Sequence, residues 1–389
     1  MKILVITPSF LPKIGGLEMA VHNLSLNWAK MGHQVCVANM ISNCASHPEA
    51  DYEVRKIRVL RGGDRFGWHH FPWNRWMSNQ IDRVIQDFNP DMISAHFAYP
   101  CGIWLAGVSP DIPWTITCHA ADVQTLKDYG YGYRLKFNID EEIAGALGKA
   151  TKVIVISENI RRIVESLGVP SGAITRIPVG ADSRLRDFGR DMNIRAAMHI
   201  PAGCHYILSV GRNYFAKGFE IGLAAFAKIA DRFPETYYLF IGKDTGILAE
   251  QAERLGVAER VRTCEMLAGP HLWSAYRGAI LYLSPSRIEG FPCVGVEAIM
   301  AGLPLVMTNC PGNKEVLEHG VNGLFCAVDD IDGMAGQLAL LLADRELRQR
   351  LARGSRERSH LYDWTDISHA YLEACFGANG RHCHHDFQN

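Results

Sequence analysis

The stretch that most constrains the fold of this chain runs from Ser284 to Gly302. The residues directly before it, 279–283, are apolar and rich in strand formers, so they predict a buried strand. Gly290 and Pro292 then break the pattern, and apolar residues return at helical spacing from Val294 to Met300. We therefore expect a strand, a loop and a helix in that order, which is the building unit of a parallel α/β sheet.

The start of this helix predicts an anion site. The first backbone N–H groups, those of Cys293, Val294 and Gly295, are expected to lack intrahelical partners, and the helix dipole adds positive charge there. Two acids frame the site, Glu289 in the loop and Glu297 one turn into the helix. Their carboxylates can accept hydrogen bonds from the hydroxyl groups of one ligand. The stretch therefore predicts binding of a phosphate and a sugar.

The spacing of the two acids is not specific by itself, because a glutamate on a surface helix is usually solvated. The neighbours of Glu297 argue for a buried position, since Ala298, Ile299 and Met300 follow it directly. A buried carboxylate needs a hydrogen-bond partner. We therefore expect a protein group or a ligand to satisfy Glu297.

Strand-length and helix-length segments alternate along the 389 residues of the chain. This length predicts two domains rather than one core, and we place them at 1–183 and 184–364, each a doubly wound, Rossmann-like α/β sheet. A helix at 365–378 is expected to pack back on the first domain, and a tail at 379–389 to be disordered. The predicted strands are 2–7, 35–38, 91–95, 114–118, 152–157, 174–178, 206–210, 237–241, 261–264, 279–283, 303–308 and 323–328.

Composition excludes several classes of protein. Apolar residues make up 48% and charged residues 21%, with a formal net charge of −1, so no nucleic-acid partner is indicated. Eleven cysteines without a CxxC pair fit thiols in a reducing compartment. The apolar run Ile3–Ile6 is too short for a signal peptide, and no run approaches the roughly 20 residues of a membrane span. We therefore expect a cytoplasmic protein whose membrane contact, if any, is peripheral.

Glycines and histidines lie at the predicted carboxyl ends of strands in the first domain, where open α/β sheets bind ligands. Gly15 and Gly16 follow the first strand, and the pattern does not distinguish a ligand loop from a flexible turn. His96 and His119 each end a later strand. A single histidine there more often packs or caps than takes part in catalysis, so position alone leaves both open.

Charged residues of the second domain also suggest a ligand. Arg212 and Lys217 lie in one loop and can converge on a diphosphate, although exposed cations are common and the spacing is no proof. Asp330 and Asp332 have the D-x-D form that some enzymes use to hold a metal. Because they directly precede a helical segment, we expect helix caps and no requirement for a metal.

These segments together resemble the retaining GT-B glycosyltransferases of family 4 type, the large family that includes sucrose synthase and bacterial mannosyl- and glucosyltransferases. The chain departs from the family pattern at Ala120, at Val179 and at Cys264 to Met266. The matching segments are Pro12-Lys13-Ile14-Gly15-Gly16-Leu17-Glu18, His119-Ala120-Ala121-Asp122, Gly211-Arg212 with Lys217-Gly218, Glu289-Gly290-Phe291-Pro292 and Glu297-Ala298-Ile299-Met300-Ala301-Gly302.

The resemblance implies a GT-B fold, in which an acceptor-side N-terminal domain and a nucleotide-sugar-binding C-terminal domain face each other across a cleft. It implies retaining transfer of a hexose from a UDP- or GDP-sugar to a hydroxyl group. The acceptor would be a glycan, a lipid-linked glycan or a small molecule in bacterial polysaccharide, glycolipid or glycoconjugate biosynthesis. The nucleotide sugar is a co-substrate, and no cofactor is required.

The resemblance also assigns residues. His119 and Glu289 are the predicted catalytic residues, at the transferring sugar and its hydroxyls. Arg212 and Lys217 would hold the diphosphate and Glu297 the ribose, and the donor's own β-phosphate would take the proton of the acceptor hydroxyl. The predicted donor-binding residues are Gly16, Arg212, Lys217, Gly290, Phe291, Pro292, Cys293, Val294 and Glu297.

Two questions stay open at this stage. The segment 55–76 interleaves basic and aromatic residues, and is either a loop packed on its own aromatic side chains or a patch for anionic lipid or a phosphate-bearing acceptor. The second interpretation places the protein at the cytoplasmic face of the membrane. The activity also has alternatives, namely a nucleotide-sugar epimerase, a phosphorylase, or an inactive transferase-like subunit that regulates a partner.

Overall fold

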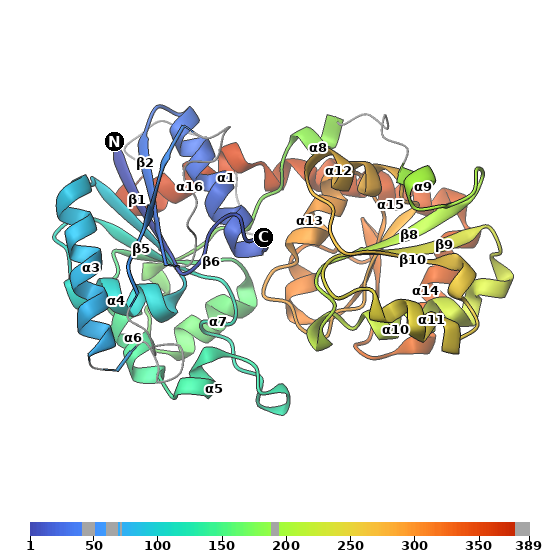
Figure 1. Ribbon diagram of the computed structural model, residues 1–389, viewed down its shortest axis with the longest axis horizontal. Coiled ribbons are helices and arrows are strands. Elements are labelled where there is room, and N and C mark those ends of the chain that lie inside the picture. Colours follow the sequence, from blue (N-terminus) through green and yellow to red (C-terminus); the bar gives the residue numbers. More distant parts are fainter. Residues whose placement is uncertain (41–50, 60–68, 71, 188–193, 378–389) are drawn as a thin grey trace. The chain divides into compact units, whose positions relative to one another are not determined.

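The computed structural model describes residues 1–40, 51–59, 69–70, 72–187 and 194–377. The chain forms two compact units, each with its own sheet (Figure 1). Unit 1 comprises Met1–Val179 together with Trp364–Asn389, and unit 2 comprises Gly180–Asp363. These divisions fall slightly earlier in the chain than the expected boundaries after 183 and 364. The expected tail at 379–389 lies outside the described residues.

The described residues of unit 1 form a parallel sheet in the order β3-β2-β1-β4-β5-β6-β7. Its central strands are buried along their length, as expected for a sheet covered on both faces. Ile3 of β1 pairs with Val35 of β2 and with Met92 of β4. The strands are β1 (Lys2–Thr7), β2 (Gln34–Asn39), β3 (Glu53–Lys56), β4 (Met92–His96), β5 (Trp114–Cys118), β6 (Lys152–Val155) and β7 (Ile174–Arg176).

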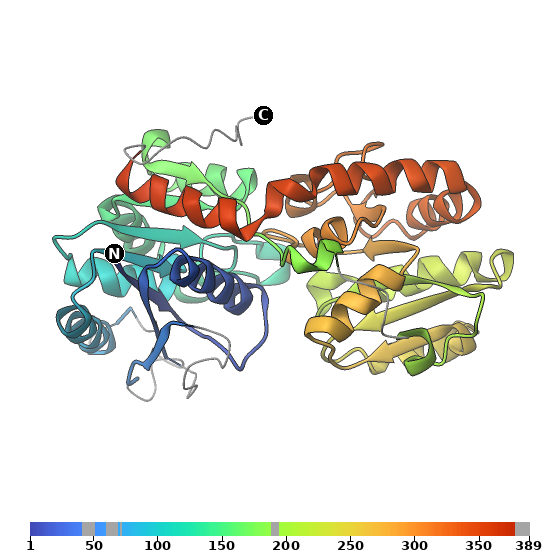
Figure 2. The same ribbon diagram turned by 90° about the horizontal axis from the view of Figure 1, so that it is seen from above.

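Helices cover both faces of this sheet. The C-terminal helix α16 packs on α1 (Figure 2). At this contact the Trp28 indole donates to the Ser368 carbonyl at 3.0 Å and meets the edge of the Tyr371 ring. On the other face α3 packs on α4, and α4 packs on α6. The α-helices of unit 1 are α1 (Gly16–Lys30), α3 (Trp73–Phe88), α4 (Ile103–Val108), α5 (Tyr133–Phe137), α6 (Asp140–Lys149), α7 (Glu158–Ser166) and α16 (Trp364–Phe376).

Unit 2 has a parallel sheet in the order β10-β9-β8-β11-β12-β13. The chain crosses over between β10 and β11, so β8 and β11 are neighbours although the sequence separates them widely. The strands are β8 (His205–Val210), β9 (Thr236–Ile241), β10 (Val261–Cys264), β11 (Leu281–Ser284), β12 (Leu305–Thr308) and β13 (Gly323–Cys326).

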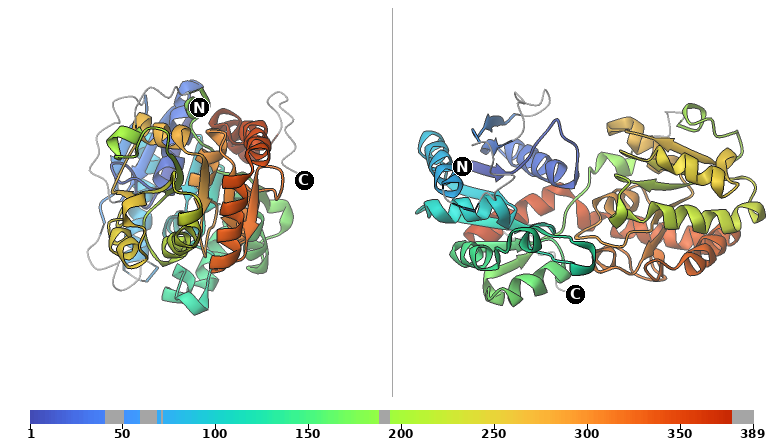
Figure 3. Two further views of the ribbon diagram at one scale, coloured as in Figure 1. Left: turned by 90° about the vertical axis from the view of Figure 1, so that its right-hand side faces the viewer. Right: turned by 60° about the horizontal axis from the view of Figure 1, so that its bottom comes forward.

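The core of unit 2 lies between this sheet and the helices α10, α11 and α14, with Phe219, Phe226, Tyr238, Phe240 and Leu338 buried there. Helices α14 and α15 pack against β13 and appear in orange-red in the left view of Figure 3. The helices of unit 2 are α8 (Arg184–Asp187), α9 (Ile194–Ala197), α10 (Phe219–Ile229), α11 (Ile247–Arg254), α12 (Gly269–Gly278), α13 (Cys293–Met300), α14 (Ile331–Ala343) and α15 (Arg345–Arg358).

Gly302 and Asp330 lie at two helix ends, and the predicted cap is confirmed for Asp330. Helix α13 ends just before Gly302, whose φ of +74° is the left-handed conformation that glycine adopts readily. Asp330 caps α14 by accepting the Gly333 N–H at 2.8 Å. Asp332 does not cap the helix but pairs with Lys228 at 2.5 Å. The D-x-D segment is therefore part of a helix start.

The interpretation of 55–76 as one loop is wrong for its described part. Arg55 lies in strand β3, which the sequence pattern did not predict, and its guanidinium pairs with Glu53 and Asp87. Trp73 and Trp76 belong to the first turn of α3. Residues 60–68 and 71 lie outside the described residues. No described helix is both long enough and apolar enough to cross a membrane.

Candidate active site

The segments that carry the predicted residues of unit 2 begin at the carboxyl ends of β8 and β11. Two loops leave the sheet there, which we name the β8 loop (residues 211–218) and the β11 loop (residues 285–292). Because β8 and β11 are adjacent parallel strands, their following loops lie side by side. The carboxyl edge of an open α/β sheet is where ligands bind in such folds.

Lys217 and Glu289 form a buried ion pair across the two loops. The Lys217 Nζ lies 2.6 Å from Glu289 Oε1, and the Ser286 hydroxyl donates to the same oxygen at 2.8 Å. Glu289 is 8% exposed. Burial alone would lower the pKa of Lys217, but the adjacent charge and hydrogen bond of Glu289 outweigh it and raise the pKa. The site therefore holds a fixed cation beside a fixed carboxylate.

Gly218 explains how Lys217 reaches this position. It follows Lys217 with a φ of +59°, and a Cβ built there would lie 2.3 Å from the Pro285 carbonyl oxygen. Any side chain would thus push the β8 loop away from the β11 loop. The predicted partner Arg212 is exposed and has no ion pair with a residue of the described segments. The structure therefore brings Lys217, but not Arg212, to Glu289.

Arg287 fastens the two loops together, and sequence reasoning missed it. Its guanidinium donates to the Phe215 carbonyl at 2.8 Å, and pairs with Glu220 and Asp329 at 2.6 Å each. The group also lies over the Phe215 ring. Its partners come from two distant parts of the sequence, residues 215–220 and Asp329, so no local pattern could identify it.

Replacing Arg287 with leucine or lysine is expected to weaken nucleotide binding about tenfold, measured by isothermal titration calorimetry. Lysine cannot reproduce the planar guanidinium with its several donors, so the nucleotide affinity of both variants should decrease by a similar factor. Glu220 and Asp329 are partly exposed and can regain water, so stability should change little. The matched control is Arg260→Leu. Arg260 directly precedes β10, and its guanidinium pairs with Asp231. Unchanged affinity in both Arg287 variants would contradict this role.

The start of α13 differs from the expectation in one respect. The Cys293 N–H donates to the Phe291 carbonyl at 3.0 Å, and the Gly295 N–H donates to the Pro292 carbonyl at 2.8 Å. Of the three predicted groups only the Val294 N–H has no acceptor among the residues that the structure describes. Phe291 is buried and meets the Tyr362 ring. The start of α13 therefore offers an anion fewer free backbone donors than the sequence predicted, because two of the three N–H groups already donate to carbonyls of the loop.

Glu297 has a protein partner. The Tyr276 hydroxyl, from α12, donates to Glu297 Oε2 at 2.7 Å. Burial raises the pKa of Glu297 to about 7, although the Tyr276 hydrogen bond lowers it, and Asp182 raises it further. Sequence reasoning predicted the need for a partner but not its identity, because Tyr276 lies on the preceding helix. The carboxyl group is thus poised to ionise near neutral pH.

In unit 1 the structure brings His96 and His119 together. The His96 Nδ1 lies 3.1 Å from the His119 Nε2, and both rings are buried. Burial lowers the pKa of both histidines, that of His119 to about 3. The Phe97 ring stacks on His119 at a centroid distance of 5.3 Å. The sequence interpretation preferred His119 over His96, whereas in the structure the two rings form a pair in direct contact.

Asp122 holds the backbone around His119. Its Oδ1 accepts the N–H groups of His119 at 3.1 Å and of Ala120 at 2.9 Å, and its Oδ2 accepts that of Ala98 at 2.8 Å. Burial raises the pKa of Asp122 to about 6, against the lowering effect of these bonds. The carboxylate therefore joins the loops that follow β4 and β5, and Ala120 in place of glycine does not prevent this.

Replacing Asp122 with alanine is expected to lower the free energy of unfolding by about 3 kcal/mol or more, because three backbone donors lose their acceptor. Denaturant unfolding followed by circular dichroism measures this change. Asp122→Asn should cost clearly less, since its single carbonyl oxygen can still serve His119 and Ala120. Equal losses in the two variants would show that the charge, and not the hydrogen bonding, matters.

The glycine pair also packs on an acid. Gly16 is exposed and begins α1, while Glu18 in its first turn is 3% exposed. Glu18 accepts the Ser9 hydroxyl at 2.5 Å and pairs with Lys13 at 3.0 Å. A Cβ on Gly15 would lie 2.6 Å from the Glu18 carboxylate. The loop is therefore constrained by close packing.

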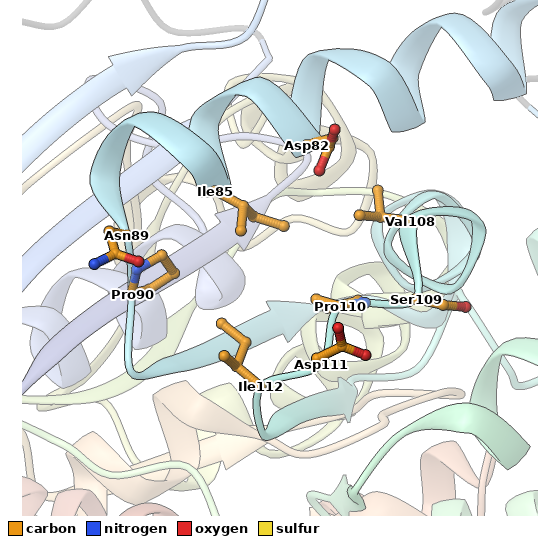
Figure 4. Close-up of a pocket in the computed structure, with 9 residues that line it drawn as sticks. All are labelled: Asp82, Ile85, Asn89, Pro90, Val108, Ser109, Pro110, Asp111 and Ile112. Carbon is orange, nitrogen blue, oxygen red and sulfur yellow. The ribbon is translucent and has the colours of Figure 1, made fainter.

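A cavity of about 300 Å³ lies elsewhere in unit 1 (Figure 4). It lies between α3 and α4 and is lined by Ile85, Val108 and Ile112 among others. Pro90 and Ile112 come just before β4 and β5, so the cavity is at the amino ends of these strands. His96 and His119 lie at the opposite, carboxyl ends of these strands. None of the predicted site residues lines this cavity.

Comparison with known proteins identifies the class. The sucrose-phosphate synthase from Thermosynechococcus elongatus superimposes with a TM-score of 0.78 at 20% identity, covering 96% of this chain and 97% of the other. Anabaena HepE in complex with UDP-glucose gives a TM-score of 0.76 at 19% identity, covering 96% and 98%. The two-sheet architecture is therefore the GT-B fold, which confirms the predicted fold class.

Family models and a relative define the family. Residues 14–185 match the model described as Glycosyltransferase Family 4, and residues 192–358 match that of Glycosyl transferases group 1. The glycogen synthase of Mycobacterium tuberculosis is 28% identical over 97% of this chain and 95% of its own length. The chain belongs to the family 4 glycosyltransferases, a family of retaining hexosyltransferases. The resemblance drawn from the motifs is thus confirmed.

Proposed function

We propose that this chain transfers a hexose from a nucleoside-diphosphate sugar to a hydroxyl group with retention at the anomeric carbon. The observation that carries the proposal is the buried pair of Lys217 and Glu289, joined at 2.6 Å. A diphosphate needs a cation, and the sugar bonded to it needs a hydrogen-bond acceptor for its hydroxyls. The pair offers both groups to neighbouring parts of one ligand.

In this mechanism the bond between the anomeric carbon and the β-phosphate oxygen stretches first, and negative charge grows on the diphosphate. Lys217, Arg212 and the Val294 N–H are assigned to this charge, which they stabilise more in the transition state than in the substrate. The departing phosphate oxygen takes the proton of the acceptor hydroxyl. The acceptor oxygen bonds to the anomeric carbon on the same face, and the nucleoside diphosphate leaves.

The remaining assignments follow the geometry of each unit. Glu297 is assigned to the ribose, because a carboxyl group with a pKa of about 7 ionises readily when hydroxyls donate to it. His119 is assigned to the transferring sugar. Phe291 is assigned to support of the β11 loop rather than to ligand contact, since it is buried against Tyr362. The other donor-side backbone positions are Gly16, Gly290, Pro292 and Cys293.

UDP-glucose is the first donor to test, because the structural neighbour HepE is described in complex with it. GDP-sugars are the expected alternative. The acceptor is proposed only as a hydroxyl compound, since the relatives include a glycogen synthase and a mannosylfructose-phosphate synthase. A membrane-facing role of residues 55–76 stays a prediction, since residues 60–68 and 71 lie outside the described residues. Within the described part, Arg55 pairs with Glu53 and Asp87.

A thermal-shift series with UDP, GDP, ADP and dTDP and their hexose conjugates tests the donor class. A nucleotide at 100 times its dissociation constant should stabilise the wild type by about 2.7 kcal/mol. The control Lys228→Ala should respond like the wild type, since Lys228 pairs with Asp332 in an exposed position. A folded protein that responds to no nucleotide would contradict the proposal.

Product analysis separates transfer from related reactions. NMR of the product should show the anomeric configuration of the donor, and an inverted anomer would refute retention. Sugar phosphate released on addition of inorganic phosphate would indicate a phosphorylase instead. A changed sugar in the absence of any acceptor would indicate an epimerase.

A further inference from the structure

His96 is a buried residue for which the motifs offer no role. It ends β4 with 0% of its surface exposed. Its Nδ1 lies 3.1 Å from His119 Nε2, and its Nε2 lies 3.4 Å from the Ser94 hydroxyl. A buried imidazole with both nitrogens facing polar groups forms part of a hydrogen-bonded chain, here Ser94, His96 and His119.

Stacking holds the two rings in place. Tyr371 of α16 lies parallel to His96 within 16° at 6.3 Å, and Phe97 lies parallel to His119 within 20° at 5.3 Å. Phe97 has a φ of +77°, which is rare for an aromatic residue and is a strained conformation typical of functional sites. The bonds of Asp122 to the Ala98 and His119 backbones restrict the same loops. Neither ring can turn without breaking these contacts.

The short contact fixes which nitrogen of His119 remains for a ligand. Its Nε2 is occupied by His96, and its Nδ1 has no hydrogen-bond partner among residues 1–40, 51–59, 69–70, 72–187 and 194–377. One hydrogen lies between the two rings. If His119 donates it, both histidines carry their hydrogen on Nε2, which is the more stable form of a neutral imidazole, and His96 donates onward to Ser94. If His96 donates it, both rings take the less stable form.

We propose that His96 is the positioning residue of His119. His96 accepts a hydrogen bond from the His119 Nε2–H and donates its own Nε2–H to the Ser94 hydroxyl. The lone pair on His119 Nδ1 is then left to accept a hydrogen bond from a hydroxyl of the bound sugar. The hydroxyl in this last step rests on the proposed function, whereas the hydrogen arrangement does not. In histidine sites generally, the hydrogen bond made by one ring nitrogen determines whether the other ring nitrogen carries a hydrogen.

The environment keeps this lone pair free. Burial lowers the pKa of His119 to about 3 and that of His96 well below its ordinary value. Both rings are therefore neutral at physiological pH, and His119 Nδ1 faces a ligand as a hydrogen-bond acceptor.

Nitrogen NMR of ligand-free protein labelled with ¹⁵N-histidine tests the hydrogen arrangement directly. The wild type should show His119 Nδ1 as an unprotonated nitrogen and Nε2 as protonated, with His119→Gln identifying the signals. In His96→Leu the Nε2–H would lose its buried partner, so the hydrogen should move to Nδ1. A protonated Nδ1 in the wild type, or the same arrangement in His96→Leu, would overturn the proposal.

Kinetics test the consequence for the sugar. His96→Leu should lower kcat roughly tenfold or more, with KM for the nucleotide sugar unchanged. His96→Gln should keep most of kcat, because its amide oxygen can accept the His119 Nε2–H. If both variants lose the same fraction of kcat, with melting temperatures near that of the wild type, His96 only packs against its neighbours and does not position His119. If no donor is turned over at all, the proposed function fails, while the NMR result in wild type still decides the role of His96.

Discussion

Replacing Lys217 with alanine is expected to lower the free energy of unfolding by about 3 kcal/mol and to reduce transfer by at least about a hundredfold. The stability loss arises because Glu289, which is 8% exposed, keeps its charge without its cation. The loss of activity arises because the cation assigned to the diphosphate is gone. Urea unfolding and initial rates of transfer measure the two effects.

A double-variant cycle separates the two effects. Lys217→Met combined with Glu289→Gln removes both charges with little change of volume, so most of the stability should return. Transfer should remain abolished, because neither the cation nor the carboxylate is restored. Lys228→Ala, which removes an exposed cation of the same unit, should leave both measurements near those of the wild type. A double variant as unstable as Lys217→Ala would show that the charges are not coupled.

Replacing Glu297 with glutamine is expected to stabilise the protein above neutral pH by roughly 3 kcal/mol. Burial raises the pKa of Glu297 from 4.5 to about 7, and a tenfold change in an ionisation constant corresponds to about 1.4 kcal/mol. The carboxyl group favours folding most below pH 4.5, and this advantage is lost as the pH rises through about 7. Glutamine has no charge to desolvate and can still accept the Tyr276 hydroxyl.

Unfolding free energies of both proteins between pH 5 and pH 8.5 measure this difference. The variant's advantage should grow up to about pH 7 and then remain constant. The same variant should bind nucleotide about tenfold more weakly, since the carboxylate assigned to the ribose hydroxyls is absent. A difference that does not change with pH would mean that Glu297 is ionised throughout this range.

Local sequence predicted most of the elements. The strands that it missed or misplaced are the least regular ones, such as β3, where Glu53 to Lys56 are charged or half-buried and give no apolar alternation. Gly218 and Gly302, which the motifs contain, adopt positive φ values that glycine accepts readily. The backbone donors of α13 were overestimated, because the bonds of Cys293 and Gly295 depend on the turn geometry.

The sequence by itself determined the two α/β series, the family and the residues at the strand ends, because periodicity and short motifs are local properties. Only the tertiary structure decided which groups meet. Lys217 reaches Glu289 because β8 and β11 are neighbours in the sheet, and His96 reaches His119 because β4 pairs with β5. Strand order is set by packing of the whole unit, so these pairs, and the pKa values that they fix, are not visible in any stretch of sequence.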